Sequence, residues 1–467
     1  MKFPKQSSHF IEQGVSFSLW QQQVIYLKDK FSEQPQKTWL LFCQDSYLFS
    51  LYFFALVAAN KRIVLPPNGQ PLQLEQCMVH ADIFLGDRNE SQNPDNRDLV
   101  DEYPYFDISA LNDLLTHNTD TAINDVNLVL NPESDIVFFT SGSSGQAKAI
   151  YKKFNQLIIE VEQLEKTFSK QLDNGDSDAA LVMATVSHQH IYGLLFKLLW
   201  PLWSGRDLYL QAFAYPEHLV QKIKQLPNRD ICLISSPAYY HRLLNDNVLA
   251  EVRDQLHMLF SSGGPLNAAA SVALYSELNI RPIEVFGSTE TGGIAWRQRV
   301  SLDDESWQVF SEIQCLADSE TQRLAILSPY VDNQQWYQTD DRVELIDKQR
   351  FKLLGRADRI VKIEEKRCSL DELGARLTEH EWIAQAYVLV HDQADKRRCL
   401  AVVAELSSAG EIAFSEDKKF NFDRQLKAYL KQYFEAIVVP RKFRYLEQLP
   451  YNSQGKLNKK YLESLFD

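Results

Sequence analysis

The sequence predicts an α/β protein with a large N-terminal domain, residues 1–354, and a small α+β domain, residues 355–467. Over the first three-quarters of the chain, short apolar runs alternate with amphipathic stretches of helix length. This alternation is typical of mostly parallel sheets covered by helices. Several of the apolar runs are continuous, as in strands that are buried on both faces. A length of 467 residues allows two or three domains.

The expected elements of the large domain follow in chain order. Strands are predicted at residues 38–43, 136–140, 180–186, 231–235 and 258–260, and helices at Phe154–Leu172, Tyr192–Trp203 and Leu266–Leu278. The most apolar run, Tyr47–Ala59, is shorter than the roughly 20 residues that a membrane span needs. It therefore predicts a buried core helix, and we expect no stable membrane insertion.

After about Val300 the chain becomes more strand-like and more charged, up to Leu354. The smaller domain follows, with helices expected near Leu370–His380 and Phe422–Tyr433 and strands near 386–390 and 400–404. A charged loop, Gly355–Arg359, separates the two domains. Such a short charged connection indicates a hinge rather than a flexible tether.

Composition excludes several classes of protein. The net charge of −13 argues against a nucleic-acid-binding protein, which normally presents a basic face. The six cysteines form no CxxC pair, so neither a zinc ribbon nor a disulfide scaffold is expected, and a reducing compartment is indicated. The N-terminus shows no secretory signal. We therefore expect a cytoplasmic protein.

A glycine-rich loop gives the most prominent local signal. The segment Phe139–Lys148 reads FTSGSSGQAK and directly follows a predicted strand. Small hydroxyl residues between glycines let the backbone approach a ligand closely and offer N–H and O–H donors to a polyphosphate. The segment lacks the Gly-Lys-Ser/Thr ending of a Walker A loop, because Lys148 lies between two alanines. An ordinary strand-to-helix turn is the alternative interpretation.

Four further stretches follow in a fixed order: SSGGPL (261–266), EVFGSTETGG (284–293), WYQTDD with LLGRADRIVKIEEKR (336–341 and 353–367), and LPYNSQGKL (449–457). With these five motifs the chain resembles the adenylate-forming superfamily, which includes acyl- and aryl-CoA synthetases, luciferases and the adenylation domains of nonribosomal peptide synthetases. The resemblance covers nearly the whole chain, which in its compact length is similar to bacterial stand-alone acyl or aryl acid ligases. It implies ATP and Mg²⁺ as cofactors, and a C-terminal lid domain that moves.

The resemblance also implies roles for individual residues. The loop from Thr140 to Lys148 would hold the β- and γ-phosphates of ATP, Thr289 the α-phosphate, and Glu290 the Mg²⁺ ion, which prefers carboxylate oxygen. Phe286 and Glu284 would face adenine, and Asp341 the ribose. The residues placed at the nucleotide are Thr140, Ser141, Gly142, Ser143, Ser144, Gly145, Lys148, Gly263, Gly264, Glu284, Phe286, Gly287, Asp341 and Arg356.

Three more residues match functional positions of the superfamily. Lys456 corresponds to the catalytic lysine, whose ammonium would stabilise charge that develops between the carboxylate and the leaving phosphate. Asp358 matches the hinge position. His190, in ATVSHQHIYG, would gate the acyl pocket or contact the carboxylate. For His190, a metal pair with His188 and a packed core histidine are the alternatives.

Two positions depart from the superfamily pattern. The ribose motif, usually Thr-Gly-Asp, reads Thr339-Asp340-Asp341, and aspartate is among the better-tolerated replacements if that position needs a positive φ. In the IKxxGxR pattern Glu365 replaces the glycine that faces the pantetheine arm. This side chain puts the acceptor step in question.

The stretch VSHQHIYG carries no carboxylate to pair with a substrate ammonium, so an α-amino acid is disfavoured and a fatty or aryl carboxylic acid fits better. The acceptor thiol would belong to coenzyme A or to the phosphopantetheine of an acyl carrier protein. Residues 355–467 carry 20 Lys+Arg and 18 Asp+Glu, against 29 and 44 in the rest of the chain. This mildly favours an acidic carrier near Lys396, Arg397, Arg398, Lys418 and Lys419.

The prediction is an ATP-dependent, AMP-forming carboxylic acid–thiol ligase. A non-catalytic acyl- or nucleotide-binding protein of the same fold is the alternative from another class.

Overall fold

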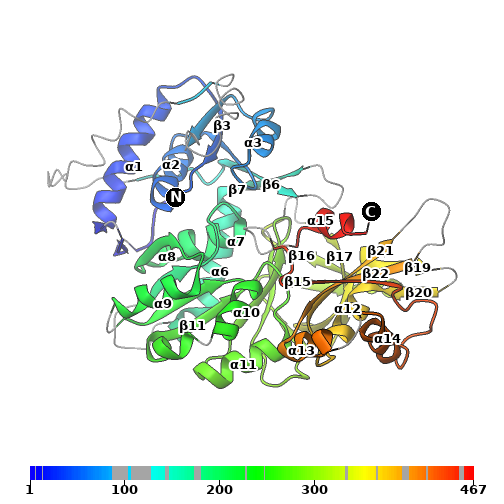
Figure 1. Ribbon diagram of the computed structural model, residues 1–467. Coiled ribbons are helices and arrows are strands. Elements are labelled where there is room, and N and C mark those ends of the chain that lie inside the picture. Colours follow the sequence, from blue (N-terminus) through cyan, green and yellow to red (C-terminus); the bar gives the residue numbers. More distant parts are fainter. Residues whose placement is uncertain are drawn as a thin grey trace. The chain divides into compact units, whose positions relative to one another are not determined.

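The computed structural model describes residues 1–467 apart from 6, 13, 87–103, 107–127, 142–146, 173–179, 227–228, 247, 332–334, 364–365, 392–398, 417–418, 452–456 and 467. The chain forms two compact units (Figure 1). Unit 1 contains residues 1–304, 308–314 and 327–336, and unit 2 contains residues 305–307, 315–326 and 337–467. The predicted boundary at residues 354/355 stays a prediction, and residues 337–354 group with unit 2.

The first sheet of unit 1 has the strand order β5-β3-β4-β6-β7 and is parallel except for β7, which pairs antiparallel with β6. Its strands are β3 (Thr38–Phe42), β4 (Arg62–Leu65), β5 (Ile83–Gly86), β6 (Asp135–Ser141) and β7 (Ala147–Lys153), and the helices nearby in sequence are α1 (Phe17–Ser32), α2 (Ser46–Ala58) and α3 (Pro71–Met78). Asp45 caps α2 by accepting a hydrogen bond from the Leu48 amide (2.7 Å). Almost every residue of α2 is buried, which confirms the predicted core helix.

The second sheet of unit 1 runs β13-β12-β11-β10-β8-β9-β1-β2. Strands β9, β8, β10, β11 and β12 are mutually parallel, whereas β13 is antiparallel to β12. The strands are β1 (His9–Phe10), β2 (Val15–Ser16), β8 (Leu181–Ala184), β9 (Leu208–Ala212), β10 (Ile231–Ser235), β11 (Leu256–Ser261), β12 (Ile283–Ser288) and β13 (Gly292–Arg297). The end of β14 (Ser306–Val309) pairs with β13.

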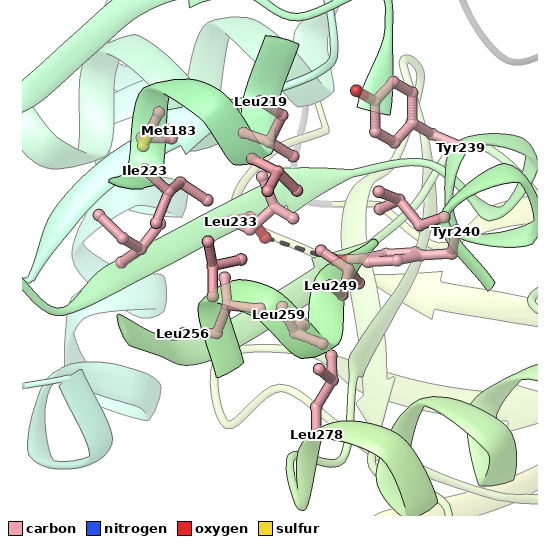
Figure 2. Close-up of a cluster of buried hydrophobic side chains, with 14 of the residues drawn as sticks. Met183, Leu219, Ile223, Leu233, Tyr239, Tyr240, Leu249, Leu256, Leu259 and Leu278 are labelled. Carbon is pink, nitrogen blue, oxygen red and sulfur yellow. Dashed lines mark hydrogen bonds between the residues drawn. The ribbon is translucent and has the colours of Figure 1, made fainter. Parts of the chain in front are cut away.

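Helices and buried side chains pack against this sheet. The helices are α6 (Phe154–Leu172), α7 (Ile191–Gly193), a π-helix (Leu194–Leu199), α8 (Trp200–Ser204), α9 (Pro216–Lys224), α10 (Pro237–Asp246), a 3₁₀-helix (Leu249–Gln255) and α11 (Ala268–Leu278). Figure 2 shows the cluster in which Leu233 and Leu259 pack with Leu219, Leu249 and neighbouring side chains. The buried Tyr240 hydroxyl donates to the Phe260 carbonyl (3.0 Å), so its polar end is satisfied inside an apolar core.

Unit 2 contains a sheet of order β15-β16-β17-β18, a hairpin β19–β20, and a three-stranded sheet β21-β22-β23. The strands are β15 (Gln314–Ala317), β16 (Arg323–Leu327), β17 (Tyr337–Leu345), β18 (Arg350–Arg356), β19 (Ile360–Ile363), β20 (Lys366–Ser369), β21 (Ile383–His391), β22 (Cys399–Leu406) and β23 (Lys442–Leu446), with helices at Ala357–Arg359 (3₁₀), α12 (Leu370–Thr378), α13 (Ser408–Glu416), α14 (Lys419–Leu430) and α15 (Lys459–Ser464). Both faces of β22 are buried, since Val402 and Val403 belong to separate apolar clusters.

The elements expected from the sequence are present, with three differences of detail. The helix expected at Phe422–Tyr433 begins at Lys419, whose ammonium donates to the Phe443 carbonyl (3.0 Å) and pairs with Asp423. The helix expected at Tyr192–Trp203 contains a π-helical turn. The glycine-rich loop connects the two antiparallel strands β6 and β7, so the alternative of a strand-to-helix turn was wrong.

Candidate functional site

The β6–β7 hairpin presents the two ends of the glycine-rich loop. Thr140 pairs with Lys148 in its register, and Ser141 with Ala147. Gly142, Ser143, Ser144 and Gly145 lie outside the described residues. A hairpin holds the two ends of the loop side by side, which fits the predicted phosphate-binding loop but does not test it.

Lys148 and Glu290 are far apart in the sequence, and the fold brings their side chains together. The Lys148 ammonium lies 3.8 Å from Oε1 of Glu290. The lysine side chain is 63% exposed and the glutamate side chain 26% exposed. The residue predicted to bind the terminal phosphates therefore lies beside the residue predicted to bind Mg²⁺. At this exposure the pair itself adds little stability.

Thr289 and Glu290 lie in a tight turn between the antiparallel strands β12 and β13. Reciprocal hydrogen bonds close the turn: the Ser288 amide donates to the Thr291 hydroxyl (3.0 Å), and the Thr291 amide donates to the Ser288 hydroxyl (3.2 Å). At Gly287 an added Cβ would lie 2.2 Å from the Gly292 carbonyl oxygen, so the two strands approach too closely for a side chain there. The turn is thus locally well defined.

The predicted adenine side is formed by the loop after β11 and by β12. The Ser262 hydroxyl donates to the Val285 carbonyl (2.8 Å) and ties this loop to β12. Gly263 has a φ of +87°, a conformation that glycine adopts without strain, and a Cβ at Gly264 would meet no atom nearer than the Pro237 ring at 4.0 Å. Phe286 is half-buried beside this loop. The open backbone and the ring fit the predicted adenine slot.

The carboxylate of Glu284 is bound by two arginines. Glu284 is buried, and its two carboxylate oxygens accept hydrogen bonds from the Arg297 guanidinium at 2.8 and 2.7 Å. Arg299 donates to the same carboxylate at 3.2 Å. Side chains alternate along a strand, so Glu284 and Phe286 share one face of β12. The adenine contact of Glu284 stays a prediction, and the geometry counts against it because both oxygens already bind guanidinium groups.

The two histidines near β8 differ. His188 is buried, with Nδ1 2.8 Å from the Ser46 hydroxyl and Nε2 2.9 Å from the Cys43 carbonyl oxygen. Burial lowers the pKa of His188 well below its usual range, and the nearby Lys197 acts in the same direction. Burial also lowers the pKa of Lys197 to about 7. His188 is therefore the packed core histidine, and it is not the residue that the motif singled out.

His190 is half-buried and precedes α7, and its role in gating stays a prediction. In the part of the chain that the structure describes, no three His, Cys, Asp or Glu side chains are arranged to hold a metal ion. This counts against the alternative of a His188–His190 metal pair.

Unit 2 brings Asp341, Arg356 and Asp358 together. Arg356 makes two hydrogen bonds of 2.8 Å to Asp358, and its guanidinium lies 3.8 Å from Asp341. Burial raises the pKa of Asp341, whereas Arg356 acts in the opposite direction. The same guanidinium lowers the pKa of Asp358 through its hydrogen bonds. The predicted ribose and hinge residues therefore share one cation.

The departure at Asp340 causes no backbone strain. Among the described residues, those with a positive φ other than glycine are Asn60, Asn279 and Gln322. Asp340 instead forms an ion pair with Arg323, and its Oδ2 lies 3.6 Å from Arg356.

Several predicted residues cannot be placed. Lys456 and Glu365 lie outside the described residues, as do Lys396, Arg397, Arg398 and Lys418 of the basic cluster. The ammonium of Lys419 already bonds Asp423 and the Phe443 carbonyl, which weakens its assignment to carrier binding.

Sequence reasoning missed two charged residues behind the Thr289–Glu290 turn. Lys152 on β7 and Glu160 on α6 are both buried. Lys152 donates to the Glu290 carbonyl in the turn, and Glu160 accepts from the Gly293 amide at the start of β13. Lysine and glutamate are almost never fully buried unless they are paired. Lys152 lies in a lysine-rich segment and Glu160 in an amphipathic helix, which the sequence shows, but their partners are not visible in it.

The sequence pattern of the AMP-binding enzyme family matches residues 33–322, more than half of the chain. The chain belongs to this family of AMP-binding enzymes. A 4-coumarate–CoA ligase of Cereibacter sphaeroides is 23% identical over 331 residues, which cover 70% of this chain and 71% of the relative. A D-alanine–D-alanyl carrier protein ligase of Staphylococcus aureus is 24% identical over 367 residues, with 72% of each chain covered.

Solved structures agree on the fold. A benzoate CoA ligase from Burkholderia xenovorans superposes with a TM-score of 0.76 at 16% identity, covering 99% of this chain and 97% of that one. ATP-bound MatB from Rhodopseudomonas palustris gives a TM-score of 0.77 at 16% identity, covering 97% and 94%. The predicted family, the α/β fold class and the AMP-forming ligase class are confirmed. Among the described residues, no helix has both the length and the apolarity needed to cross a membrane.

Proposed function

We propose that the protein activates a fatty or aryl carboxylic acid with ATP and transfers the acyl group to a phosphopantetheine thiol of coenzyme A or an acyl carrier protein. The observation that carries this proposal is the approach of Lys148 to Glu290, with 3.8 Å between Nζ and Oε1. A cation for phosphate and a carboxylate for Mg²⁺ are both needed where the triphosphate binds.

In the first step the substrate carboxylate attacks the α-phosphorus of ATP. A bond forms between carboxylate oxygen and phosphorus, and the bond to the bridging oxygen breaks, which releases pyrophosphate and leaves acyl-AMP. Thr289 donates to an α-phosphate oxygen, Lys148 binds the departing phosphates, and Lys456 stabilises the charge that develops between the two. Mg²⁺ held by Glu290 would polarise the phosphoryl oxygens.

In the second step the thiol attacks the acyl carbonyl, and AMP leaves as the thioester forms. Asp341 and Arg356 hold the ribose hydroxyls, and Asp358 is the hinge between the two steps. The choice between coenzyme A and a carrier protein is part of the proposal that experiment must decide. So is a cytoplasmic location, which the composition supports.

The nature of the acid follows from the stretch around His190. The described side chains there include the buried His188 and the half-buried Tyr192, whose hydroxyl donates to the Ser235 carbonyl (3.1 Å). The stretch itself supplies no carboxylate for a substrate ammonium, and an unpaired buried ammonium is costly. This supports a fatty or aryl acid over an α-amino acid.

Pyrophosphate release from ATP and Mg²⁺, with hydroxylamine as the trap, tests the proposal. The panel holds short and long fatty acids, hydroxybenzoates, cinnamates and several amino acids. We expect one class of fatty or aryl acid to respond, and coenzyme A or holo-carrier protein then to replace hydroxylamine. Lys456→Ala should abolish pyrophosphate release but spare thioester formation from supplied acyl-AMP. A folded protein that is silent with every acid contradicts the proposal and favours a binding-only role.

A further inference from the structure

Lys152 is a buried lysine on β7, with only 3% of its surface exposed. Its ammonium donates to the backbone carbonyl of Glu290 (2.8 Å) and to that of Tyr330 (2.6 Å). Neither contact is part of a regular strand ladder. Lys152 therefore fixes the backbone of the residue whose side chain is proposed to bind Mg²⁺.

Glu160 on α6 binds the other end of the same turn. It is 4% exposed, and its Oε1 accepts a hydrogen bond from the Gly293 amide (2.6 Å). Gly292 has a φ of +67°, and an added Cβ there would lie 2.7 Å from Oε2 of Glu160. The carboxylate thus packs directly against the backbone that follows Glu290, and only glycine leaves room for it.

The two buried groups also compensate each other. Burial raises the pKa of Glu160, whereas the charge of Lys152 and the Gly293 amide lower it. Burial raises the pKa of the neighbouring Tyr330 hydroxyl, and the charges of Glu160 and Glu312 raise it further. The Lys152 ammonium has two carbonyl partners, and the Glu160 carboxylate has an amide partner. Both groups can therefore remain charged in the interior.

Lys152 also connects this turn to the glycine-rich hairpin. Lys148 and Lys152 lie four residues apart on one strand, and alternation places them on the same face of β7. Lys148 approaches the carboxylate of Glu290, whereas Lys152 binds its carbonyl. A single rigid strand therefore sets the spacing between the phosphate lysine and the Mg²⁺ ligand.

We propose that Lys152 and Glu160 are positioning residues that hold the Thr289–Glu290 turn in the conformation that binds Mg²⁺ and ATP. This inference rests on the proposed function, because it takes Glu290 as the Mg²⁺ ligand. Neither residue touches substrate. Each acts through the backbone of the turn, as residues behind a metal ligand generally do.

The test compares Lys152→Met with Lys153→Met. Lys153 is the next residue on β7, but its ammonium pairs with Asp135 (2.7 Å) on the opposite face. We expect Lys152→Met to raise the Mg²⁺ concentration for half-maximal pyrophosphate release, and the KM for ATP, by about tenfold or more. The KM for the acid should change by no more than about twofold, because no contact of the acid with the turn is proposed. Thioester formation from supplied acyl-AMP should change much less than the Mg²⁺ and ATP responses, because it uses only Thr289 of the turn and not the Mg²⁺ ligand.

Lys152→Arg, which keeps the charge and the donors, should recover part of the Mg²⁺ and ATP response. Calorimetric titration of Mg²⁺ and ATP into each variant adds a readout that does not depend on turnover. A folded Lys152→Met with the Mg²⁺ dependence of the wild type would overturn the inference. An equal loss in the Mg²⁺ response, in both KM values and in thioester formation would also overturn it, since that would indicate a merely structural role.

Glu160→Gln keeps the inference testable if Lys152→Met does not fold. The amide oxygen can still accept from Gly293, so we expect a smaller shift in the same direction. The double variant Lys152→Met/Glu160→Gln has no buried carboxylate that lacks its cation. Its unfolding temperature should therefore exceed that of Lys152→Met. A double variant that is less stable would contradict the pairing. A wild type without pyrophosphate release would instead contradict the proposed function itself.

Discussion

In unit 1 the Thr289–Glu290 turn is attached through buried contacts, whereas in unit 2 the segment with Arg356 and Asp358 is attached through half-exposed ones. Behind the turn, Lys152 and Glu160 are 3% and 4% exposed and bind backbone atoms. In unit 2, the Arg356 and Asp358 side chains are 44% and 42% exposed and bind each other. A buried backbone contact fixes geometry, while an exposed ion pair costs little to break.

The difference fits the two tasks that the proposed function gives these regions. Charge that develops on phosphate is stabilised best by groups that need no rearrangement. A hinge must instead change its backbone conformation between the two half-reactions, so its contacts must break and re-form at a small cost in free energy. Substitutions at Glu290, Glu284 and Asp358 should therefore differ in the size and the kind of their effects.

Glu290→Gln should reduce pyrophosphate release by about 10²–10³-fold, because it removes charge stabilisation at a preorganised site. The loss should be partly recovered at high Mg²⁺ concentration. Initial rates across a Mg²⁺ titration check this. The control is Glu312→Gln, which removes an exposed carboxylate of the same unit that pairs with Lys166 (2.8 Å). If Glu290→Gln kept the Mg²⁺ dependence of the wild type, the turn would not be the metal site.

Glu284→Gln should destabilise unit 1 by about 3–5 kcal/mol, since it leaves buried guanidinium groups without a full partner charge. Thermal unfolding measures this effect, and Glu251→Gln, which breaks the exposed Lys224–Glu251 pair, should have a much smaller one. In protein that remains folded, the KM for ATP should not rise. A raised KM with unchanged stability would restore Glu284 to the adenine site and would show that this buried pair is functional rather than structural.

The sequence predicted the fold because the fold depends on local pattern. Continuous apolar runs such as 231–235 became central parallel strands, and the uniformly apolar Tyr47–Ala59 became a buried helix. The motif positions alone predicted that Lys148 and Glu290 both act at the triphosphate, and the fold places their side chains near each other. The antiparallel direction of β7 was missed because residues 147–153 carry three lysines and no clear strand alternation.

The missed and doubtful residues share one cause: their roles depend on partners far away in the chain. The partners of Lys152 lie at Glu290 and Tyr330, and the partner of Glu160 lies at Gly293. No spacing of residues in the local sequence predicts such contacts. Glu284 was assigned to adenine from its motif position, but Arg297 and Arg299 on the next strand and beyond decide where its carboxylate binds.

Asp358→Asn should slow thioester formation about tenfold and pyrophosphate release much less, because a hinge acts between the two half-reactions. Arg356 holds the pKa of Asp358 below its usual range. The Asp358 carboxylate is therefore ionised throughout the neutral range, and its contact with Arg356 is lost only as the pH falls through that lowered pKa. The ratio of variant to wild-type rate should accordingly be constant between about pH 6 and 9, well above the usual aspartate pKa.

Single-turnover measurement of each half-reaction separates the two rates, and Glu379→Gln, which breaks the exposed Arg376–Glu379 pair in the same unit, is the control. Equal slowing of both half-reactions by Asp358→Asn would place the residue at the nucleotide rather than at a hinge. In that case the half-exposed ion pair would serve binding, and exposure alone would not distinguish a moving segment from a fixed one.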